Sequence, residues 1–234
     1  MIDGLTILLK DKKIIRLSSL EMPGRGSEKG QMHEAAARQA LADLLPAGTN
    51  VTIFQTRDPK KGRMNRMGHQ LAHLVKKDKP KDGVETPAQL WINGWMAQQG
   101  WALVMPSDFN PELTAELYAQ ESLARQHQTG LWAPDQWPVL TPEQALSVNG
   151  ELRVVEGIVT GAGSSHNNTF LNFGPDWKTD FTVMISPSLR RDLSHKGVDV
   201  LGLTHHTVRA RGFVRPYNGT VIELENPAHL EVLQ

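Results

Sequence analysis

Residues 5–20 decide the fold of the first half of the chain: residues 5–9 read LTILL, residues 10–13 read KDKK and residues 14–20 read IIRLSSL. The two aliphatic runs have the length of short strands, and four charged residues separate them. This pattern predicts a β-hairpin with a charged turn. A proline at 23 and glycines at 24, 26 and 30 predict that a loop follows the hairpin.

Beyond this hairpin the pattern alternates between strands and helices. Helices are predicted where apolar residues recur at helical spacing, at residues 33–45, 87–99 and 111–128. Strands are predicted at residues 51–55, 68–75 and 101–105. This order of elements predicts a small β-barrel with three helices over residues 1–135.

Residues beyond 150 are a succession of short strands. Strand patterns recur at residues 152–162, 169–174, 180–186, 206–216 and 220–225, with a helical stretch at 188–196. Asn218-Gly219 joins the last two strands and is the strongest short hairpin signal. We therefore predict a second small barrel of OB type over residues 151–234, after a proline-containing linker at 136–150. The expected fold class is mainly β with α (α+β).

Five landmarks follow one another in the first half. They are Asp3-Gly4-Leu5-Thr6, residues 16–24 (RLSSLEMPG), residues 65–72 (NRMGHQLA), Gly100-Trp101-Ala102 and Gly130-Leu131-Trp132. Together they resemble the staphylococcal-nuclease (thermonuclease) family. Residues 169–183 and 208–212 also resemble the OB-like C-terminal extension of two-domain proteobacterial members. The resemblance implies a nuclease-like barrel followed by a second barrel.

The resemblance also implies a hydrolytic site. In the family, two carboxylates and a backbone carbonyl hold Ca²⁺, a glutamate activates water and two arginines stabilise the phosphate charge. These six positions fall, in that order, on Leu5, Glu21, Met22, Gly24, Arg16 and His69.

Most side chains of that site are replaced in this chain. Leu5 and Gly24 offer no carboxylate, and Asp3 lies two residues before Leu5, about 6–7 Å along the strand. We therefore predict that the Ca²⁺ site is lost, with Glu21 as the remaining metal candidate and no cofactor. Arg16, Glu21 and His69 are then degenerate catalytic positions. Arg16 and Glu21 form either a residual pocket for phosphate or carboxylate, or a structural ion pair.

Residues 57–81 contain nine Lys or Arg and two Asp, although the whole chain has 25 basic and 25 acidic residues. Such a segment is either a track for a phosphate backbone or a pair of solvated loops. Candidate anion-binding side chains here are Lys60, Lys61, Arg63 and Arg66.

The second half interleaves aromatic and basic residues. The aromatic ones are Phe170, Phe173, Trp177, Phe181 and Tyr217, and the basic ones are Lys178, Arg209, Arg211 and Arg215. OB barrels bind single strands through such combinations, but aromatic residues at period two also fill a barrel core. Arg209 and Arg211 are further candidates for anion binding.

Other site chemistries lack a pattern here. The absence of cysteine excludes disulfides and thiolate sites. His69 and His73 would lie about 13 Å apart on a strand, too far for one zinc ion. No apolar window reaches 18 residues, and the N-terminus does not resemble a signal peptide. We expect a soluble protein, with cytoplasm and periplasm both open.

Three functions are compatible with these patterns. The first is a nuclease-like pseudoenzyme that binds nucleic acid or an acidic protein surface. The second is an active metal-dependent nuclease with a rearranged site that uses Glu21, Glu28 and Arg16. The third is a structural subunit of a protein complex.

Overall fold

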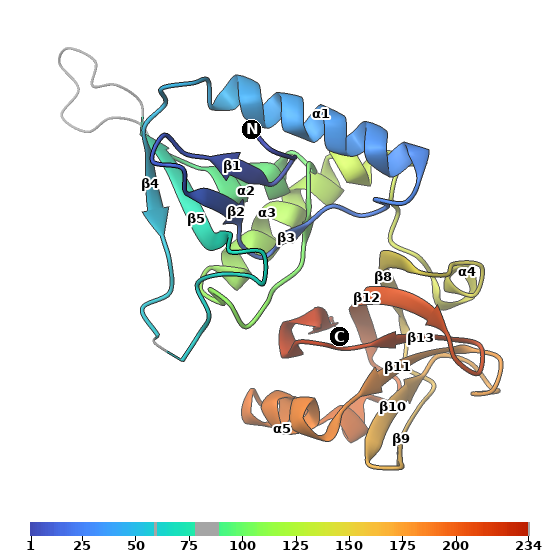
Figure 1. Ribbon diagram of the computed structural model, residues 1–234. Helices are drawn as coiled ribbons and strands as arrows, with labels where there is room; N and C mark the ends of the chain where they lie inside the picture. Colours follow the sequence, from blue (N-terminus) through green and yellow to red (C-terminus); the bar gives the residue numbers. More distant parts are fainter. Residues whose placement is uncertain (59, 78–88, 234) are drawn as a thin grey trace. The chain divides into compact units, whose positions relative to one another are not determined.

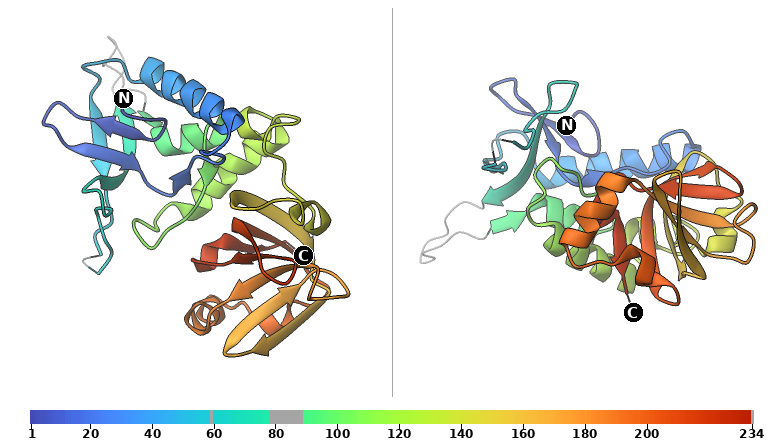
Figure 2. Two further views of the ribbon diagram at one scale, coloured as in Figure 1. Left: turned by 45° about the vertical axis from the view of Figure 1, so that its right-hand side comes forward. Right: turned by 90° about the horizontal axis from the view of Figure 1, so that it is seen from below.

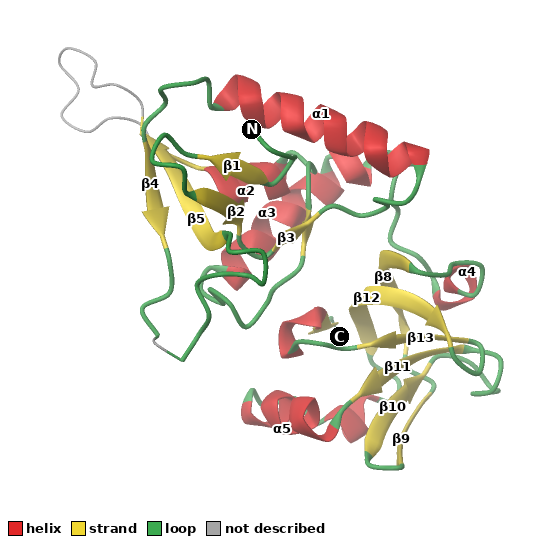
Figure 3. Cartoon of the chain, viewed as in Figure 1, coloured by secondary structure: helices red, strands yellow, loops and turns green. Residues whose placement is uncertain are grey.

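The computed structural model describes residues 1–58, 60–77 and 89–233 (Figure 1). The chain divides into two compact units, Met1–Gln136 and Trp137–Gln234. Each unit has its own cluster of buried apolar side chains. Both units combine helices with a mixed sheet, so the fold class is α+β (Figure 3).

The first unit contains a five-stranded sheet, a separate pair of strands and helices that cover the sheet. The seven described strands of the unit are β1 (Thr6–Leu8), β2 (Ile14–Leu17), β3 (Leu20–Glu21), β4 (Val51–Phe54), β5 (Gln70–Lys77), β6 (Gln89–Trp91) and β7 (Leu103–Val104). Its helices are α1 (Glu28–Leu44), α2 (Ile92–Gln98) and α3 (Thr114–Gln126), followed by a 3-10 turn at Gly130–Trp132. The order β1-β2-β5-β4, with β6 also on β5, forms the sheet, and β3 pairs with β7. Only β2 and β5 are parallel among these pairs of the described residues.

The predicted first hairpin is confirmed. Strands β1 and β2 pair antiparallel, with Thr6 opposite Arg16. In the turn, the Leu9 amide donates to the Lys13 carbonyl at 2.9 Å, and the Asp11 carboxylate accepts the Lys13 amide at 3.2 Å. Lys12 takes the left-handed conformation that closes the turn.

Helix α1 begins five residues earlier than predicted. The reason is Ser27, whose hydroxyl accepts the Gly30 amide at 3.1 Å and so caps the first turn. Ala37 and Leu41 of α1 are fully buried in the core of the first unit. Figures 1 and 2 show α1 running along the strands of that unit.

The helix predicted at residues 87–99 is shorter than expected, and residues 87–88 lie outside the described residues. Residues 89–91 form β6, with Trp91 opposite Val75 of β5. The helix begins only at Ile92. Asn93 ties its first turn to the sheet, since its side chain accepts the Leu74 amide at 3.0 Å. Strand pairing therefore outweighs the helical spacing of the apolar residues.

The second unit is built on a seven-stranded sheet. Its strands are β8 (Glu151–Ile158), β9 (Gly161–Ser165), β10 (Asn168–Asn172), β11 (Phe181–Ile185), β12 (Thr207–Pro216), β13 (Thr220–Glu223) and β14 (Leu230–Val232). Its helices are α4 (Pro142–Ala145) and α5 (Pro187–His195), with 3-10 turns at Val200–Leu203 and Pro227–His229.

The path of paired strands in this unit begins and ends with strands that are neighbours in the chain. The path runs β8-β12-β13-β11-β10-β9, and only Val159 and Thr160 separate β8 from β9 in the chain. The predicted strand 152–162 is thus divided at these two residues, where its partner changes from β12 to β10. The Asn218-Gly219 hairpin between β12 and β13 is confirmed, whereas β14, paired with β12, was not predicted.

The segment predicted as a linker, residues 136–150, is packed. Trp137, Leu140 and Ala145 are buried. The Leu140 amide donates to the Val154 carbonyl, and its own carbonyl accepts the Glu156 amide, both at 2.9 Å. A capping box at Thr141 and Gln144 starts α4. The prolines therefore mark the entry to a helix and not a free linker.

Candidate functional site

The hydrolytic positions meet where β2 passes β3. Arg16 of β2 donates from Nη2 to both carboxylate oxygens of Glu21 on β3, at 2.8 Å each. Arg25 adds a longer contact to Glu21 at 3.4 Å. The Arg16 side chain is 13% exposed and that of Glu21 is 40% exposed. Arg16 is therefore neutralised in place, as a structural ion pair would be.

The position of the first metal carboxylate lies inside the core. Leu5 has no exposed surface and belongs to the apolar cluster of the first unit. Its carbonyl accepts the Leu17 amide at 2.9 Å. The carboxylate of Asp3 accepts the Leu5 amide at 2.7 Å, so it serves the backbone of the turn. Neither residue supplies an oxygen to a metal beside Glu21.

The position of the catalytic glutamate is a backbone turn. Gly24 has φ of 67°, a conformation that residues with side chains rarely adopt, and its carbonyl accepts the Ser27 amide at 2.8 Å. Glu28, the alternative base, is exposed at the first position of α1. The residues present do not fit the Ca²⁺ site of the resemblance, because the carboxylate of Glu21 is engaged by arginines. Within the described ranges, no three His, Asp or Glu side chains are grouped to hold a metal ion.

His69 belongs to a hairpin that leads into β5, and we call residues 57–58 and 60–69 the basic hairpin. Leu71, two residues after His69, lies opposite Arg16 in the β2–β5 register. The tip is closed by Asn65, whose amide donates to the His69 carbonyl and whose side chain accepts the Met67 and His69 amides, all at 3.0 Å. The tip is therefore a defined turn.

Five cations occupy the basic hairpin. They are Arg57, Lys60, Lys61, Arg63 and Arg66. All are exposed except Lys61, which is half-buried. The carboxylate of Asp58 accepts the backbone amide of Lys60 at 2.9 Å. None of the five forms an ion pair with another described residue. The predicted residues Lys60, Lys61, Arg63 and Arg66 thus lie on one hairpin, whereas 59 and 78–81 of the predicted loop lie outside the described residues.

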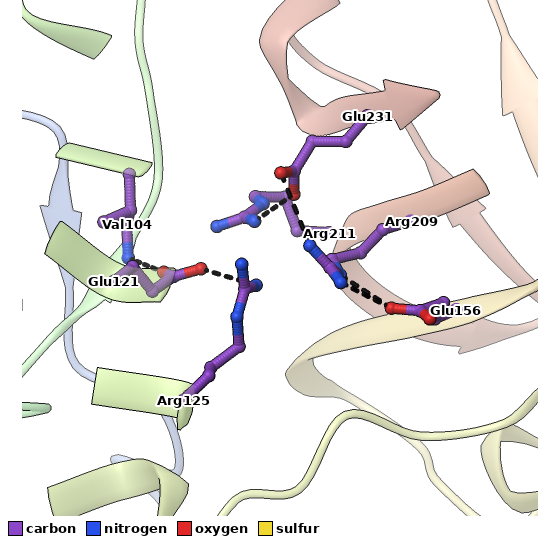
Figure 4. Close-up of polar contacts among 7 residues, drawn as sticks. All are labelled: Val104, Glu121, Arg125, Glu156, Arg209, Arg211 and Glu231. Atoms are coloured by element: carbon purple, nitrogen blue, oxygen red, sulfur yellow. Dashed lines mark hydrogen bonds and ion pairs between the residues drawn. The ribbon is translucent and has the colours of Figure 1, made fainter. Parts of the chain in front are cut away.

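Arg209 and Arg211, the anion-binding candidates of the second unit, are both held in ion pairs. Both lie on β12, between β8 and β14 (Figure 4). Arg209 donates to Glu156 at 2.6 and 2.9 Å, and Arg211 donates to Glu231 at 2.5 Å. Arg211 is fully buried. Glutamates on the neighbouring strands neutralise both arginines, so neither is presented to an anionic partner.

Another buried carboxylate serves the fold of the first unit. Glu121 on α3 accepts the Val104 amide of β7 at 2.8 Å and Nη1 of Arg125 at 3.1 Å (Figure 4). The pair joins the last helix to the last strand.

The five aromatic residues that the sequence singled out in the second unit divide into two groups. Phe173 and Phe181 are buried, with ring centroids 5.2 Å apart, and fill the core. Phe170, Trp177 and Tyr217 line a cavity at the surface. Sequence analysis overlooked the polar residues of this cavity, such as Asn172. The alternation at residues 168–172, where Thr169 and Leu171 are buried, is the signal that would have placed Phe170 and Asn172 on one outer face.

Two histidines of the first unit are shielded from solvent: His73 is buried and His33 is half-buried. His73 is 3% exposed and its ring centroid lies 5.7 Å from that of Trp91. Burial lowers the pKa of His73, and nearby groups of Glu112 and Asn110 oppose that effect. Burial also lowers the pKa of His33, whose Nε2 lies 2.9 Å from the Trp101 carbonyl.

No protein-family model and no curated protein matches this chain. Among the described helices, none is long and apolar enough to cross a membrane.

Proposed function

We propose that this protein is a catalytically degenerate, thermonuclease-like protein that binds nucleic acid through the basic hairpin without cleaving it efficiently. The observation on which this rests is the set of five cations on an ordered turn, none paired with a described carboxylate. Elsewhere Arg16, Arg153, Arg209 and Arg215 all pair with glutamates. Cations without partners are the ones that a phosphate backbone attracts.

The strand order of the second unit supports the OB type. Strands β9, β10 and β11 pair in succession, α5 follows, and β12 and β13 form a hairpin that pairs with β8 on one side and β11 on the other. This is the arrangement expected of a five-stranded Greek-key barrel. This strand order, together with the motifs of the first unit, favours a chain with two barrels, each of a type that binds nucleic acid in other proteins.

Loss of efficient cleavage follows from the first unit. A metal-dependent hydrolase needs oxygen ligands and a base near the phosphate. Leu5 is a core residue and Gly24 is a turn residue, so two carboxylates of that machinery are missing. Arg16, the position that would contact the phosphate, is held by Glu21.

Salt-dependent binding tests the proposal. Replacing Lys60, Lys61, Arg63 and Arg66 by Gln removes four phosphate-contacting charges. For a single-stranded oligonucleotide, the slope of log K against log salt is expected to become shallower by about 3, from about 0.7 for each contact. Fluorescence anisotropy of a labelled oligonucleotide measures both the affinity and the slope.

A matched variant controls for net charge. Lys10, Lys12, Lys13 and Arg38 are exposed cations of the same unit, and their replacement by Gln changes the net charge equally. We expect this control to keep the slope of the wild type. An equal loss in both variants would show that net charge and not the basic hairpin drives binding. Metal-dependent cleavage that disappears in Arg16→Ala would overturn the degenerate assignment.

A further inference from the structure

A cavity of about 390 Å³ opens on the second unit, and none of the anion-binding candidates of the sequence lines it. Four segments line it: the β9–β10 hairpin, β10 and β11, the loop between them, and the β12–β13 turn. Its principal side chains are Ser164, His166, Phe170, Asn172, Trp177 and Tyr217. Its volume is at the lower end for small-molecule sites, which suits one flat ring system with a few polar partners.

Aromatic rings are exposed at this cavity instead of being buried. Trp177 is 54% exposed and Tyr217 is 50% exposed, whereas Phe170 is half-buried. The core of this unit is filled by other residues, including Phe173 and Phe181. The exposed rings of Trp177 and Tyr217 are therefore not needed to complete the core, and their surfaces are available for stacking.

The two loops that present Trp177 and Tyr217 are tied together at Asp180. Its carboxylate accepts the Asp176 amide at 2.7 Å, and its carbonyl accepts the Thr220 amide at 3.3 Å. Gly219 has φ of 88°, and a Cβ there would lie 2.3 Å from the Asp180 carbonyl oxygen. This close approach requires glycine. The rings are thus held on a preorganised support, which lowers the entropic cost of binding.

Polar groups of the cavity suit the edge of a base. The side-chain oxygen of Asn172 accepts the Thr182 hydroxyl at 3.4 Å, which orients the amide group in the cavity wall. An amide presents a donor and an acceptor side by side, the pairing that a nucleobase edge matches. On the facing hairpin, Ser165 Oγ lies 2.9 Å from His166 Nδ1.

Two cations, Lys178 and Arg190, and the carboxylates of Asp176 and Asp180 lie near the cavity. This unit has eight Lys or Arg against ten Asp or Glu, and most of its arginines pair with glutamates. At the cavity, however, Lys178 Nζ lies 5.7 Å from the centre of the Trp177 ring. Arg190 Nη1 lies 3.4 Å from the hydroxyl of Ser164. The Asp176 carboxylate accepts the Lys178 amide at 3.0 Å, which shapes the loop.

From this geometry we propose that the cavity binds an unpaired base of single-stranded nucleic acid, stacked on Trp177 and Tyr217, with Lys178 and Arg190 beside its flanking phosphates. The inference rests on the proposed function, in which the basic hairpin supplies the long-range attraction to the same polymer. Stacking on aromatic rings tolerates any base, because every base has a π-face. The cavity therefore adds affinity for bases to an affinity for phosphates.

Paired ligands test this inference on the full chain. The probes are a labelled single-stranded oligonucleotide and an abasic oligonucleotide of the same length, which keeps the phosphates and lacks the bases. We expect wild-type protein to bind the normal strand more tightly. Trp177→Ala should weaken binding of the normal strand roughly 5- to 100-fold and remove the preference for it, as should Tyr217→Ala.

Phe213→Ala is the matched control, because Phe213 is 52% exposed on β12 and does not line the cavity. Its preference for bases should equal that of the wild type. Trp177→Phe keeps a ring and should retain most of the affinity, which separates stacking from misfolding. If Trp177→Ala and Tyr217→Ala behave like Phe213→Ala, the inference is overturned. Displacement of the oligonucleotide by a neutral oligosaccharide, with no displacement by a mononucleotide, also overturns it.

The failure of the proposed function gives a different result. If only the basic hairpin is assigned wrongly, its four-Gln variant keeps the wild-type salt slope while the preference for bases still depends on Trp177. If only the cavity is assigned wrongly, the slope changes in the four-Gln variant, and normal and abasic strands bind the wild type equally.

Discussion

The basic hairpin of the first unit and the cavity of the second unit use their side chains in opposite ways. The hairpin carries five cations without described carboxylate partners, four of them exposed, and methionines are its exposed apolar residues. The cavity is lined by three aromatic rings, two of them exposed, in a unit where arginines on β8 and β12 are paired with glutamates. One surface is suited to phosphates and the other to flat rings, so a net charge of zero is an average over two unlike surfaces.

The largest expected effect is the loss of stability when a carboxylate is restored at Leu5, the position at which the resemblance places a metal ligand. Leu5→Asp restores a carboxylate but places it in the apolar core, where an unpaired charge costs several kcal/mol. Leu5→Ala, the control for lost volume, should cost about 2–5 kcal/mol. Urea unfolding measures both free energies. If Leu5→Asp is as stable as Leu5→Ala, residue 5 is accessible to water, and the proposal that the hydrolytic site is degenerate would need revision.

A second change separates the two surfaces from each other. Phe181→Ala removes a buried ring from the core beneath the cavity and should destabilise the second unit by about 3–5 kcal/mol. We expect the preference for normal over abasic strands to fall, while the salt slope set by the basic hairpin persists. Urea unfolding and anisotropy together measure this. A parallel collapse of the salt slope would contradict two separate surfaces.

The pH dependence of stability should be smaller and should come from the first unit. Burial lowers the pKa of His73 and of His33 in the folded state, below the ordinary value of about 6.5 in the unfolded chain. The unfolded state therefore binds more protons, and stability falls as pH drops below about 6.5. Urea unfolding from pH 7.5 to 5 should show this loss, and His73→Phe should reduce it. An unchanged pH profile in that variant would exclude His73 as the cause.

The smallest expected effect comes from removing one of the two carboxylate partners of Arg209 in the second unit, since Glu231 remains 3.5 Å away. Glu156→Gln removes the partner at 2.6 Å from Arg209, and the glutamate side chain is 36% exposed, so the cost is about 1 kcal/mol or less. The salt slope of oligonucleotide binding should steepen by less than one contact. Arg215 and Glu223 form an exposed pair, so Glu223→Gln is the control for surface charge. If the two variants have the same salt slope, the pairing of Arg209 with Glu156 does not limit oligonucleotide binding by the second unit.

Local patterns predicted most elements of the fold. The KDKK turn and the Asn218-Gly219 turn were predictable, since both depend on residues adjacent in the chain. The start of α1 differed because a capping serine lies outside the apolar periodicity. Residues 89–91 were predicted as helix from their local spacing, but they form a strand. The reason is their pairing with β5, a contact between distant segments that outweighs local propensity.

Two features of the candidate site were predictable from the sequence: the missing carboxylates and the cluster of basic residues in the basic hairpin. Absence of a carboxylate at Leu5 and Gly24 can be read from the residues alone, as can the clustering of Lys60, Lys61, Arg63 and Arg66. The pairing of Arg209 with Glu156 could not, because 53 residues separate them and only the β8–β12 register brings them together.

The sequence by itself determined the types of elements, the missing carboxylates and the number of charges, because these depend on residue identity and on near neighbours. Only the tertiary structure decided which charges are neutralised and which aromatic rings face solvent. Trp177 and Tyr217 come from separate loops, and they line one cavity because Asp180 and Gly219 allow those loops to meet. Such convergence depends on strand order and register, and no local pattern in the chain encodes it.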